Sequence, residues 1–223
     1  MSAVSSNPVL YSLRNCPYAM RARMAIYVSG QSVQLRELVL TDKPSQLLES
    51  SPKGTVPVLV LPNGEVLEQS LDIMLWAFEQ GDSANYLMSF DPTLRDDMFD
   101  LIALFDTDFK QCLDLYRSAK RYHDQDLPST RQACERYIYI LEQRLTTNPY
   151  LFTTSPCLAD LAIIPFIRQF ARVERQWYLA SPYPNVRGWL NSYLQSPMFS
   201  KIMAKFPLWS ANNAPVIFGA DYL

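Results

Sequence analysis

Cys16 is the residue of this chain whose type and position most clearly indicate chemistry. It follows a short apolar stretch, residues 8–11, and it precedes Pro17 and residues 18–28, whose apolar side chains recur at helical spacing before Gly30. Proline at the first helical position and glycine after the last one are typical of helix ends. A thiol at a helix N-terminus faces unpaired backbone N–H groups and the positive end of the helix dipole, which favour its thiolate form. The pattern predicts a reactive thiol, with a buried structural cysteine as the alternative.

The residues around Cys16 restrict the kind of thiol chemistry. Arg14, Arg21 and Arg23 add positive charge near the predicted helix start. Position 19, where a two-cysteine redox motif would carry its second thiol, holds Ala19. A dithiol cycle is therefore excluded locally, and a single-thiol route through a mixed disulfide remains.

The other thiols and the histidine do not form a recognisable site. Cys112, Cys134 and Cys157 are far apart in the chain, and His123 is the one histidine. This spacing predicts neither a disulfide framework nor a zinc site, so we expect no bound metal. Ser-His-Asp and Cys-His hydrolase schemes are excluded unless His123 folds back onto a nucleophile. We expect His123 to be a solvated residue near a helix end.

Composition excludes several classes of protein. With 48% hydrophobic and 19% charged residues, the chain can bury a core and is not disordered. A net charge of -2 gives no basic footprint, which argues against a nucleic-acid partner. Apolar runs are short; residues 158–167, for example, contain Asp160 and Pro165, which argues against a membrane protein. Residues 1–8 are polar and lack a signal-peptide core, so we expect a cytoplasmic protein.

The first eighty residues alternate between strand and helix patterns. Alternating or continuous β-branched and apolar residues predict the strands, helical periodicity predicts the helices, and residues 62–65 form a turn signal. The expected strands are residues 8–11, 33–40, 56–61 and 65–67, and the expected helices are residues 18–28, 43–49 and 70–80. The order β-α-β-α-β-β-α predicts an α/β domain over residues 1–81.

The rest of the chain has helical patterns. Residues 82–91 are polar and irregular and predict a linker, and only 6 glycines against 16 prolines favour a helix-rich chain. Expected helices are residues 92 to about 123, 127 to about 145, 158–171 with a kink at Pro165, 184–196 and 197–206. Residues 207–223 show no clear period. We therefore predict an all-helical C-terminal domain over residues 92–223.

The sequence of residues 16–19, with Arg21 and Arg23 after it, resembles the glutaredoxin-like N-terminus of cysteine-type glutathione transferases. The likeness is to the omega class in particular and to bacterial-type members of this superfamily. It continues in order and spacing through residues 42–44, 51–59 and 68–73, with Val56-Pro57 and Gln69-Ser70 as its most specific parts. The resemblance implies a thioredoxin-like N-terminal domain, an all-helical C-terminal domain, glutathione as co-substrate and a homodimer.

The resemblance also implies how glutathione would be held. A cis peptide before Pro57 would let the backbone of Val56 pair with the cysteinyl part of the tripeptide as an added strand. Gln69 and Ser70, at the start of the next helix, would hold the γ-glutamyl end, and Lys43 would meet the glycyl carboxylate. The implied glutathione-binding residues are Tyr18, Lys43, Val56, Pro57, Gln69 and Ser70.

The function that the resemblance implies is that of a thiol transferase or glutathione-dependent reductase. Cys16 would be its catalytic residue, becoming glutathionylated before a second glutathione releases it. Conjugating classes instead use a hydroxyl to hold the glutathione thiolate, so Tyr11, the second choice for catalysis, or Ser12 leaves conjugation open. A non-catalytic interaction protein on the same fold, similar to stringent starvation protein A, is a further alternative. A membrane-inserting variant similar to intracellular chloride-channel proteins is the weakest, because the N-terminal half has no apolar span.

Two features of the helical half complete the expectations. The second substrate, a small hydrophobic or disulfide compound, is expected against aromatic side chains of the long helices, with Phe109, Tyr116 and Trp177 as candidates. Cys157 and Asp160 resemble the family's helix-capping pair, with cysteine in place of the usual hydroxyl residue. A thiol is a weak acceptor, so we expect a weakened cap that costs about 1 kcal/mol.

Overall fold

The computed structural model describes residues 7–219, which form two compact units. One unit contains the described residues up to 84 together with those from 197 onward, and the other contains residues 85–196. The break after Ala84 lies within the predicted linker, but the last segment of the chain belongs to the first unit and not to the helical one. The predicted C-terminal domain, residues 92–223, therefore differs from the observed units at its end.

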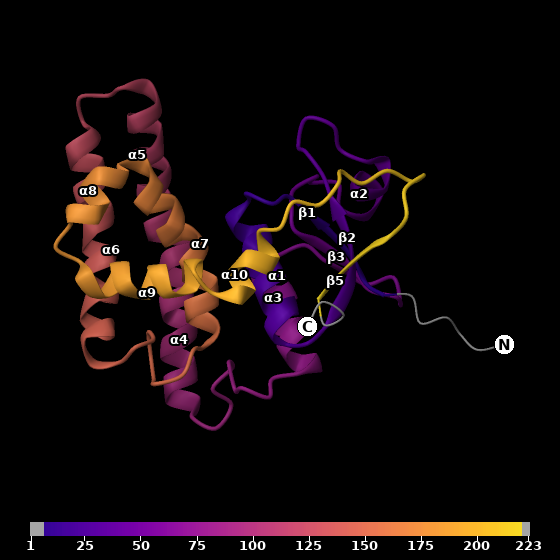
Figure 1. Ribbon diagram of the computed structural model, residues 1–223, viewed down its shortest axis with the longest axis horizontal. Helices are drawn as coiled ribbons and strands as arrows, with labels where there is room; N and C mark the ends of the chain where they lie inside the picture. Colours follow the sequence, from indigo (N-terminus) through magenta and orange to yellow (C-terminus); the bar gives the residue numbers. More distant parts are fainter. Residues whose placement is uncertain (1–6, 220–223) are drawn as a thin grey trace. The chain divides into compact units, whose positions relative to one another are not determined.

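The first unit is built on a mixed sheet of five strands in the order β4-β3-β1-β2-β5 (Figure 1). Its strands are β1 (Val9–Ser12), β2 (Ser32–Glu37), β3 (Val58–Val60), β4 (Val66–Leu67) and β5 (Val216–Gly219). Strand β1 pairs with β2 in parallel, and the other neighbours are antiparallel. The parallel pair requires the crossover that α1 provides, as the β-α-β pattern predicted.

Helices cover this sheet, and the alternation of side chains along β1 sends neighbouring residues to opposite faces. The helices of the unit are α1 (Pro17–Val28), α2 (Ser45–Ser50), α3 (Ser70–Gln80) and α10 (Pro197–Ile202). Helices α1 and α3 pack against each other, as Figure 1 also shows. Tyr11 lies in a cluster with Leu47 of α2 and Val58 of β3, while Leu10 is fully buried. The site described below lies at the end of β1, where the chain turns into α1.

The C-terminal strand is a feature that local sequence patterns did not predict. Residues 216–219 form β5 by pairing with β2, with Leu35 opposite Val216 and Val33 opposite Phe218. Phe218 is buried and its ring meets that of Phe206 at 6.0 Å, edge to face. The segment has too few residues to show a period, and its partner lies about 180 positions earlier in the chain. Residues 216–219 therefore form a strand because they pair with the edge of β2.

The second unit is helical (Figure 1). Its helices are α4 (Pro92–Leu104), η1 (Phe105–Phe109, a π-helical turn), α5 (Lys110–Tyr122), α6 (Leu127–Thr147), α7 (Leu158–Val173), α8 (Arg175–Ala180) and α9 (Pro184–Leu194). Asp91 caps α4 by accepting a hydrogen bond from Leu94 N at 3.0 Å, and His123 ends α5 with φ +55°. The expected long helix over residues 92–123 is thus real but is interrupted by η1. Helix α8 was not expected, since six residues show no clear period.

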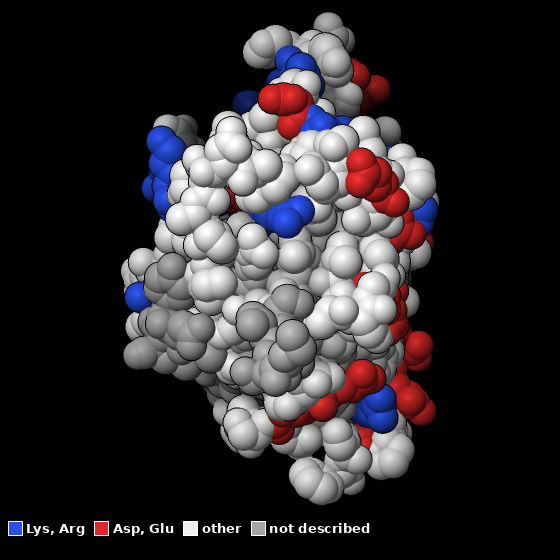
Figure 2. Space-filling view, turned by 90° about the vertical axis from the view of Figure 1, so that its right-hand side faces the viewer, with Lys and Arg blue, Asp and Glu red and all other residues white. Residues whose placement is uncertain are grey.

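On the side of the surface that Figure 2 shows, the basic side chains are scattered. There, Lys and Arg side chains lie in separate small groups and form no continuous basic surface among the residues drawn in colour. Within residues 7–219, no helix is both long enough and apolar enough to cross a membrane.

Candidate functional site

Cys16 lies where the sequence predicted it, at the residue before α1. Its backbone is extended, with φ -73° and ψ 125°, and its carbonyl oxygen accepts the first-turn hydrogen bond from Met20 N at 3.0 Å. Pro17 follows as the first helical residue, which needs no N–H partner there. The side chain is partly exposed. The thiol therefore meets both requirements of a reactive site, a helix N-terminus and access to solvent.

Val56, which lies far from Cys16 in the sequence, contacts this thiol in the fold. Cys16 Sγ donates to the carbonyl oxygen of Val56 at 3.6 Å, a contact between residues 40 positions apart. The peptide bond between Val56 and Pro57 is cis, as the resemblance implied. Val56 and Pro57 are buried at the end of the loop that leads into β3. The turn at Pro57 thus places a backbone carbonyl beside the thiol.

A buried polar network supports the loop that carries Cys16. Arg23 is 1% exposed; its Nη2 donates to the carbonyl oxygen of Arg14 at 2.6 Å, and its Nη1 donates to Ser12 Oγ. Glu37 Oε1 accepts from Arg14 N at 2.6 Å, and its Oε2 lies 3.9 Å from Arg23 Nη1. The network connects the end of β1, the loop before Cys16 and α1 with one another. Its hydrogen bonds hold the backbone of Arg14, two residues before Cys16, in place.

The electrostatics of this network extend to the thiol. Burial lowers the pKa of Arg23 to about 10, an effect that the negative charges of Glu37 and of an ionised Cys16 oppose. Burial likewise raises the pKa of Glu37, opposed by the N–H of Arg14 and the charge of Arg23. Glu37 was missed in the sequence analysis. The alternation of β2 could have revealed it, because that alternation places an acidic residue at a buried position.

The two hydroxyls considered for conjugation are buried. Tyr11 is 2% exposed, and its hydroxyl accepts from Arg36 Nη1 at 2.6 Å. The Arg36 guanidinium also lies 4.4 Å from the centre of the Trp209 ring, so it is held between two aromatic rings. Ser12 is fully buried and accepts from Arg23. Both hydroxyls therefore already serve in structural contacts.

The remaining predicted glutathione contacts lie on the same unit. Gln69 is the exposed residue before α3, and Ser70 is the first residue of that helix and is buried. Lys43 is exposed, and its Nζ passes close to Gly54, in the loop before Val56. Tyr18, in the first turn of α1, is half-buried. These residues come from the ends of helices and from loops, where backbone N–H groups and flexible side chains can meet a ligand.

Lys53 has a different partner from Lys43. Its Nζ pairs with Glu68 Oε2 at 3.2 Å, and Glu68 Oε1 accepts from Ser51 Oγ at 2.5 Å. These hydrogen bonds, that from Ser51 first, lower the pKa of Glu68. Lys53 thus connects two loops beside the predicted site.

Comparison with known proteins places this arrangement in a family. Residues 10–84 match the profile of the glutathione S-transferase N-terminal domain. Residues 109–192 match that of the glutathione S-transferase C-terminal domain. This chain belongs to the glutathione S-transferase family.

Individual relatives of this transferase agree with the profiles. It is 26% identical over 199 residues to mouse glutathione S-transferase omega-1, covering 88% of this chain and 81% of the relative. It is 25% identical to glutathione S-transferase U19 of Arabidopsis thaliana, covering 82% of this chain and 84% of the relative. A glutathione transferase family member from Pseudomonas fluorescens Pf-5, solved with two glutathione bound, superposes with a TM-score of 0.76 at 15% identity. That match covers 91% of this chain and 94% of the solved one and shows that the fold is shared.

The aromatic candidates for the second substrate lie in the helical unit. Phe109 and Tyr116 are 0% exposed, and both rings pack on Phe170 of α7, with centroids at 6.3 and 5.5 Å. The structure places these two in the core instead of in a pocket wall, because their helical spacing points them at α7. Trp177 is half-buried, and Arg131 stacks 4.4 Å from its ring centre. Of the three, Trp177 retains surface for a ligand.

Both halves of the capping box that the sequence predicted are present at the start of α7. Asp160 is fully buried; it accepts from Cys157 N at 2.9 Å and from the Cys157 thiol at 3.1 Å. It also accepts from Trp189 Nε1 at 2.8 Å and from Leu151 N at 3.1 Å. Besides its part in the capping box, the Cys157 thiol thus donates to the Asp160 carboxylate. Asp160 connects the start of α7 with α9 and with the preceding loop. These contacts do not require an acceptor at position 157.

Proposed function

We propose that this glutathione transferase is a cysteine-type enzyme, a thiol transferase or glutathione-dependent reductase with Cys16 as its catalytic residue. The observation that carries the proposal is the position of this partly exposed thiol at the N-terminus of α1, beside the carbonyl of Val56. The two hydroxyls that would support conjugation are buried and bonded within the fold. Accessibility therefore favours sulfur over oxygen as the reacting atom.

The proposed reaction is a pair of thiol–disulfide exchanges. The Cys16 thiolate attacks the glutathione sulfur of a mixed disulfide; the disulfide bond breaks, and the substrate leaves as a thiolate that takes up a proton. The thiolate of a second glutathione then attacks the Cys16–glutathione disulfide, which releases oxidised glutathione and restores the Cys16 thiolate. Overall, the mixed disulfide and one free glutathione give the substrate thiol and oxidised glutathione; the substrate sulfur is reduced and the sulfur of the free glutathione is oxidised. Ala19 offers no second thiol, so glutathione must resolve the intermediate.

The residues predicted to hold glutathione support this proposal by their placement. Val56 presents backbone groups next to Cys16, which suits pairing with the cysteinyl part of the tripeptide. Ser70 and exposed Gln69 stand at the N-terminus of α3, whose unpaired N–H groups suit the γ-glutamyl carboxylate. Exposed Lys43 supplies a positive charge for the glycyl carboxylate, and Tyr18 would flank the site.

Several relatives support glutathione as the co-substrate. The relatives named omega-1 and the solved transferases with bound glutathione share this fold, and one such structure, from Methylobacillus flagellatus KT, is 21% identical. A shorter match, 39% identical over 74 residues, is to pyrimidodiazepine synthase of Drosophila melanogaster. A homodimer, a cytoplasmic location and a small hydrophobic or disulfide second substrate stay predictions.

The deciding experiment replaces Cys16 and, as a matched control, Cys112, which is also partly exposed but lies in the helical unit. Cys16→Ala should lower the reduction of a glutathione mixed disulfide by about 100-fold or more, because the group that forms the covalent intermediate is gone. Cys112→Ala should retain wild-type activity. Full activity in Cys16→Ala would refute the assignment.

Two further measurements separate the alternatives. Tyr11→Phe should stay within about twofold of wild-type reductase activity, since its hydroxyl serves Arg36; loss of conjugating activity with an aryl halide in this variant would instead favour a hydroxyl mechanism. Mass spectrometry of the wild type incubated with oxidised glutathione should find one glutathione on Cys16. A protein that neither takes up glutathione nor binds glutathione-agarose would be an interaction protein on the same fold.

A further inference from the structure

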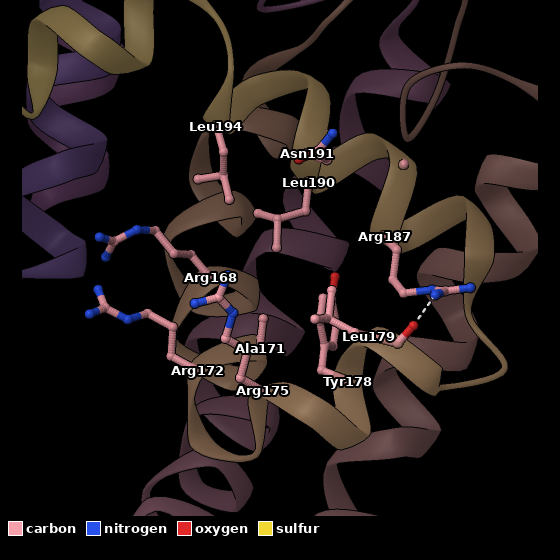
Figure 3. Close-up of a pocket in the computed structure, with 11 residues that line it drawn as sticks. Arg168, Ala171, Arg172, Arg175, Tyr178, Leu179, Arg187, Leu190, Asn191 and Leu194 are labelled. Atoms are coloured by element: carbon pink, nitrogen blue, oxygen red, sulfur yellow. Dashed lines mark hydrogen bonds between the residues drawn. The ribbon is translucent and has the colours of Figure 1, made fainter.

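The helical unit contains a pocket of about 950 Å³ between α7, α8 and α9 (Figure 3). Its volume is in the range of small-molecule binding sites. Four arginines line it, together with an apolar surface that includes Leu190 and Leu194. Its lining contains no residue that was predicted for glutathione or for the second substrate. The pocket is therefore a separate feature of the molecule.

Three of the four arginines of this pocket lie on one side of it (Figure 3). Arg168 and Arg172 lie one helical turn apart on α7, and Arg175 opens α8. Figure 3 shows the first two side chains extending side by side, with Arg175 next to them. Burial, and then the charge of Arg172, lower the pKa of Arg168, which indicates that these like charges repel each other.

Arg172 and Arg175 carry charges that no acidic side chain of residues 7–219 neutralises. No acidic residue is among the residues that line the pocket. Neither Arg172 nor Arg175 has an ion-pair partner in the described part of the chain. The neighbouring carboxylate of Glu174 is held by Arg131 at 2.7 Å and by the Tyr116 hydroxyl at 2.9 Å. A bound anion would supply the negative charge that Arg172 and Arg175 lack.

Two buried polar atoms in the lining also lack hydrogen-bond partners. Tyr178 is 5% exposed, yet its hydroxyl has no partner among residues 7–219. Figure 3 shows this hydroxyl directed toward Leu190, between the arginine side and Arg187. Arg187 Nη1 donates to the carbonyl oxygen of Leu179, while its buried Nε has no partner in the described structure. Buried polar groups are nearly always paired, so these two atoms mark a part of the pocket wall whose hydrogen bonding is incomplete.

We propose that this pocket binds the phosphate group of a phosphorylated small molecule with an apolar body. A phosphate monoester carries nearly two negative charges and three acceptor oxygens, enough for more than one guanidinium. Guanidinium groups bind phosphate oxygens in pairs. Leu190, Leu194 and Ala171 provide apolar surface for the body of the ligand. This inference does not depend on the chemistry proposed for Cys16.

Calorimetric titration of the full-length protein with phenyl phosphate tests the proposal. Phenyl phosphate should bind in a saturable way, one per chain, and at least tenfold more tightly than benzoate, which carries one charge. Phenol should not bind detectably, and added salt should weaken the binding of phenyl phosphate. Failure of phenyl phosphate to saturate, or equal affinity for benzoate, would overturn the proposal.

Two double arginine variants test whether phenyl phosphate binds in this pocket. The double variant Arg172→Gln/Arg175→Gln removes two exposed charges and should weaken phenyl phosphate binding at least tenfold. The matched variant Arg117→Gln/Arg121→Gln removes two exposed charges from α5 and should bind as the wild type does. Equal effects of the two variants would mean that general charge, and not this pocket, attracts the ligand.

A second variant fills the pocket without removing a charge. Gly188 lines the pocket from α9, and a side chain added there would meet open space. Gly188→Leu should therefore leave the protein folded while it weakens phenyl phosphate binding at least tenfold. Cys16→Ala should bind phenyl phosphate like the wild type. Undiminished binding in folded Gly188→Leu, or lost binding in Cys16→Ala, would place the ligand elsewhere.

Discussion

At the scale of single residues, the position of Cys16 depends on a buried ion pair that acts through the backbone of the preceding loop. Arg23 and Glu37 hold the loop before the thiol through the backbone of Arg14. Both side chains are nearly inaccessible, at 1% and 8% exposure. A buried charge that loses its partner is costly, because neither water nor another group compensates it.

Replacing Arg23 by methionine should therefore destabilise the protein by about 3–5 kcal/mol, because the Glu37 carboxylate would stay buried without its cation. The double variant Arg23→Met/Glu37→Leu should recover a large part of this loss, since it buries no lone charge. Urea denaturation of the single and double variants measures both values. Additive losses in the double variant would show that the two side chains do not act as a pair.

At the scale of elements, Glu174 connects three helices of the second unit. It follows α7, and it accepts from Tyr116 of α5 and from Arg131 of α6. Burial tends to raise the pKa of Glu174, but the hydrogen bonds from Arg131 and Tyr116 outweigh this effect, so its pKa lies below the ordinary value. A carboxyl whose pKa is lowered in the folded state stabilises the fold above its unfolded pKa, and this contribution disappears as the pH falls through the folded value.

Glu174→Gln should consequently cost about 1–2 kcal/mol of unfolding free energy at pH 7, where the carboxylate is charged. At a pH of about 3, below the unfolded pKa of about 4.3, the cost should be much smaller. Denaturation of both proteins at the two pH values provides the comparison. An equal cost at both would contradict an ionic role for Glu174.

At the scale of the whole chain, the last described segment completes the first unit. Strand β5 pairs with β2, and Trp209 N donates to the carbonyl oxygen of Glu37 at 2.8 Å. The same segment places the Trp209 ring on Arg36, which in turn donates to Tyr11. The C-terminal segment thus supports the sheet next to the strand that leads to Cys16.

Phe218→Ala should lower stability by about 3 kcal/mol or more, because it removes a buried aromatic side chain from β5. Hydrogen exchange of the β2 amides should accelerate, since β5 protects that edge. Leu208→Ala is the matched control, as Leu208 is 55% exposed and should change little. Unchanged protection of β2 in Phe218→Ala would mean that the strand pairing does not depend on this core contact.

The N-terminal half of the fold could be predicted because its signals are local. Pro17 and Gly30 enclose one helix, the run into β3 is continuously apolar, and Gly64 marks the hairpin with φ +89°. The helical half could be predicted in outline only, since η1 and α8 are short and carry no period of their own. Phe109 and Tyr116 were expected at a substrate wall because helical spacing alone does not distinguish the core from a cleft.

The sequence by itself determined the side chains on which the proposed chemistry of this transferase rests: one thiol before Pro17, no second thiol at Ala19, and a Val56-Pro57 pair at the family's spacing. These signals are local, because helix ends and proline constraints act over a few residues. The tertiary structure decided what surrounds that thiol and where other ligands could bind. The Arg23–Glu37 network, the β5 pairing and the arginine pocket join residues far apart in the chain, and only packing brings such residues together.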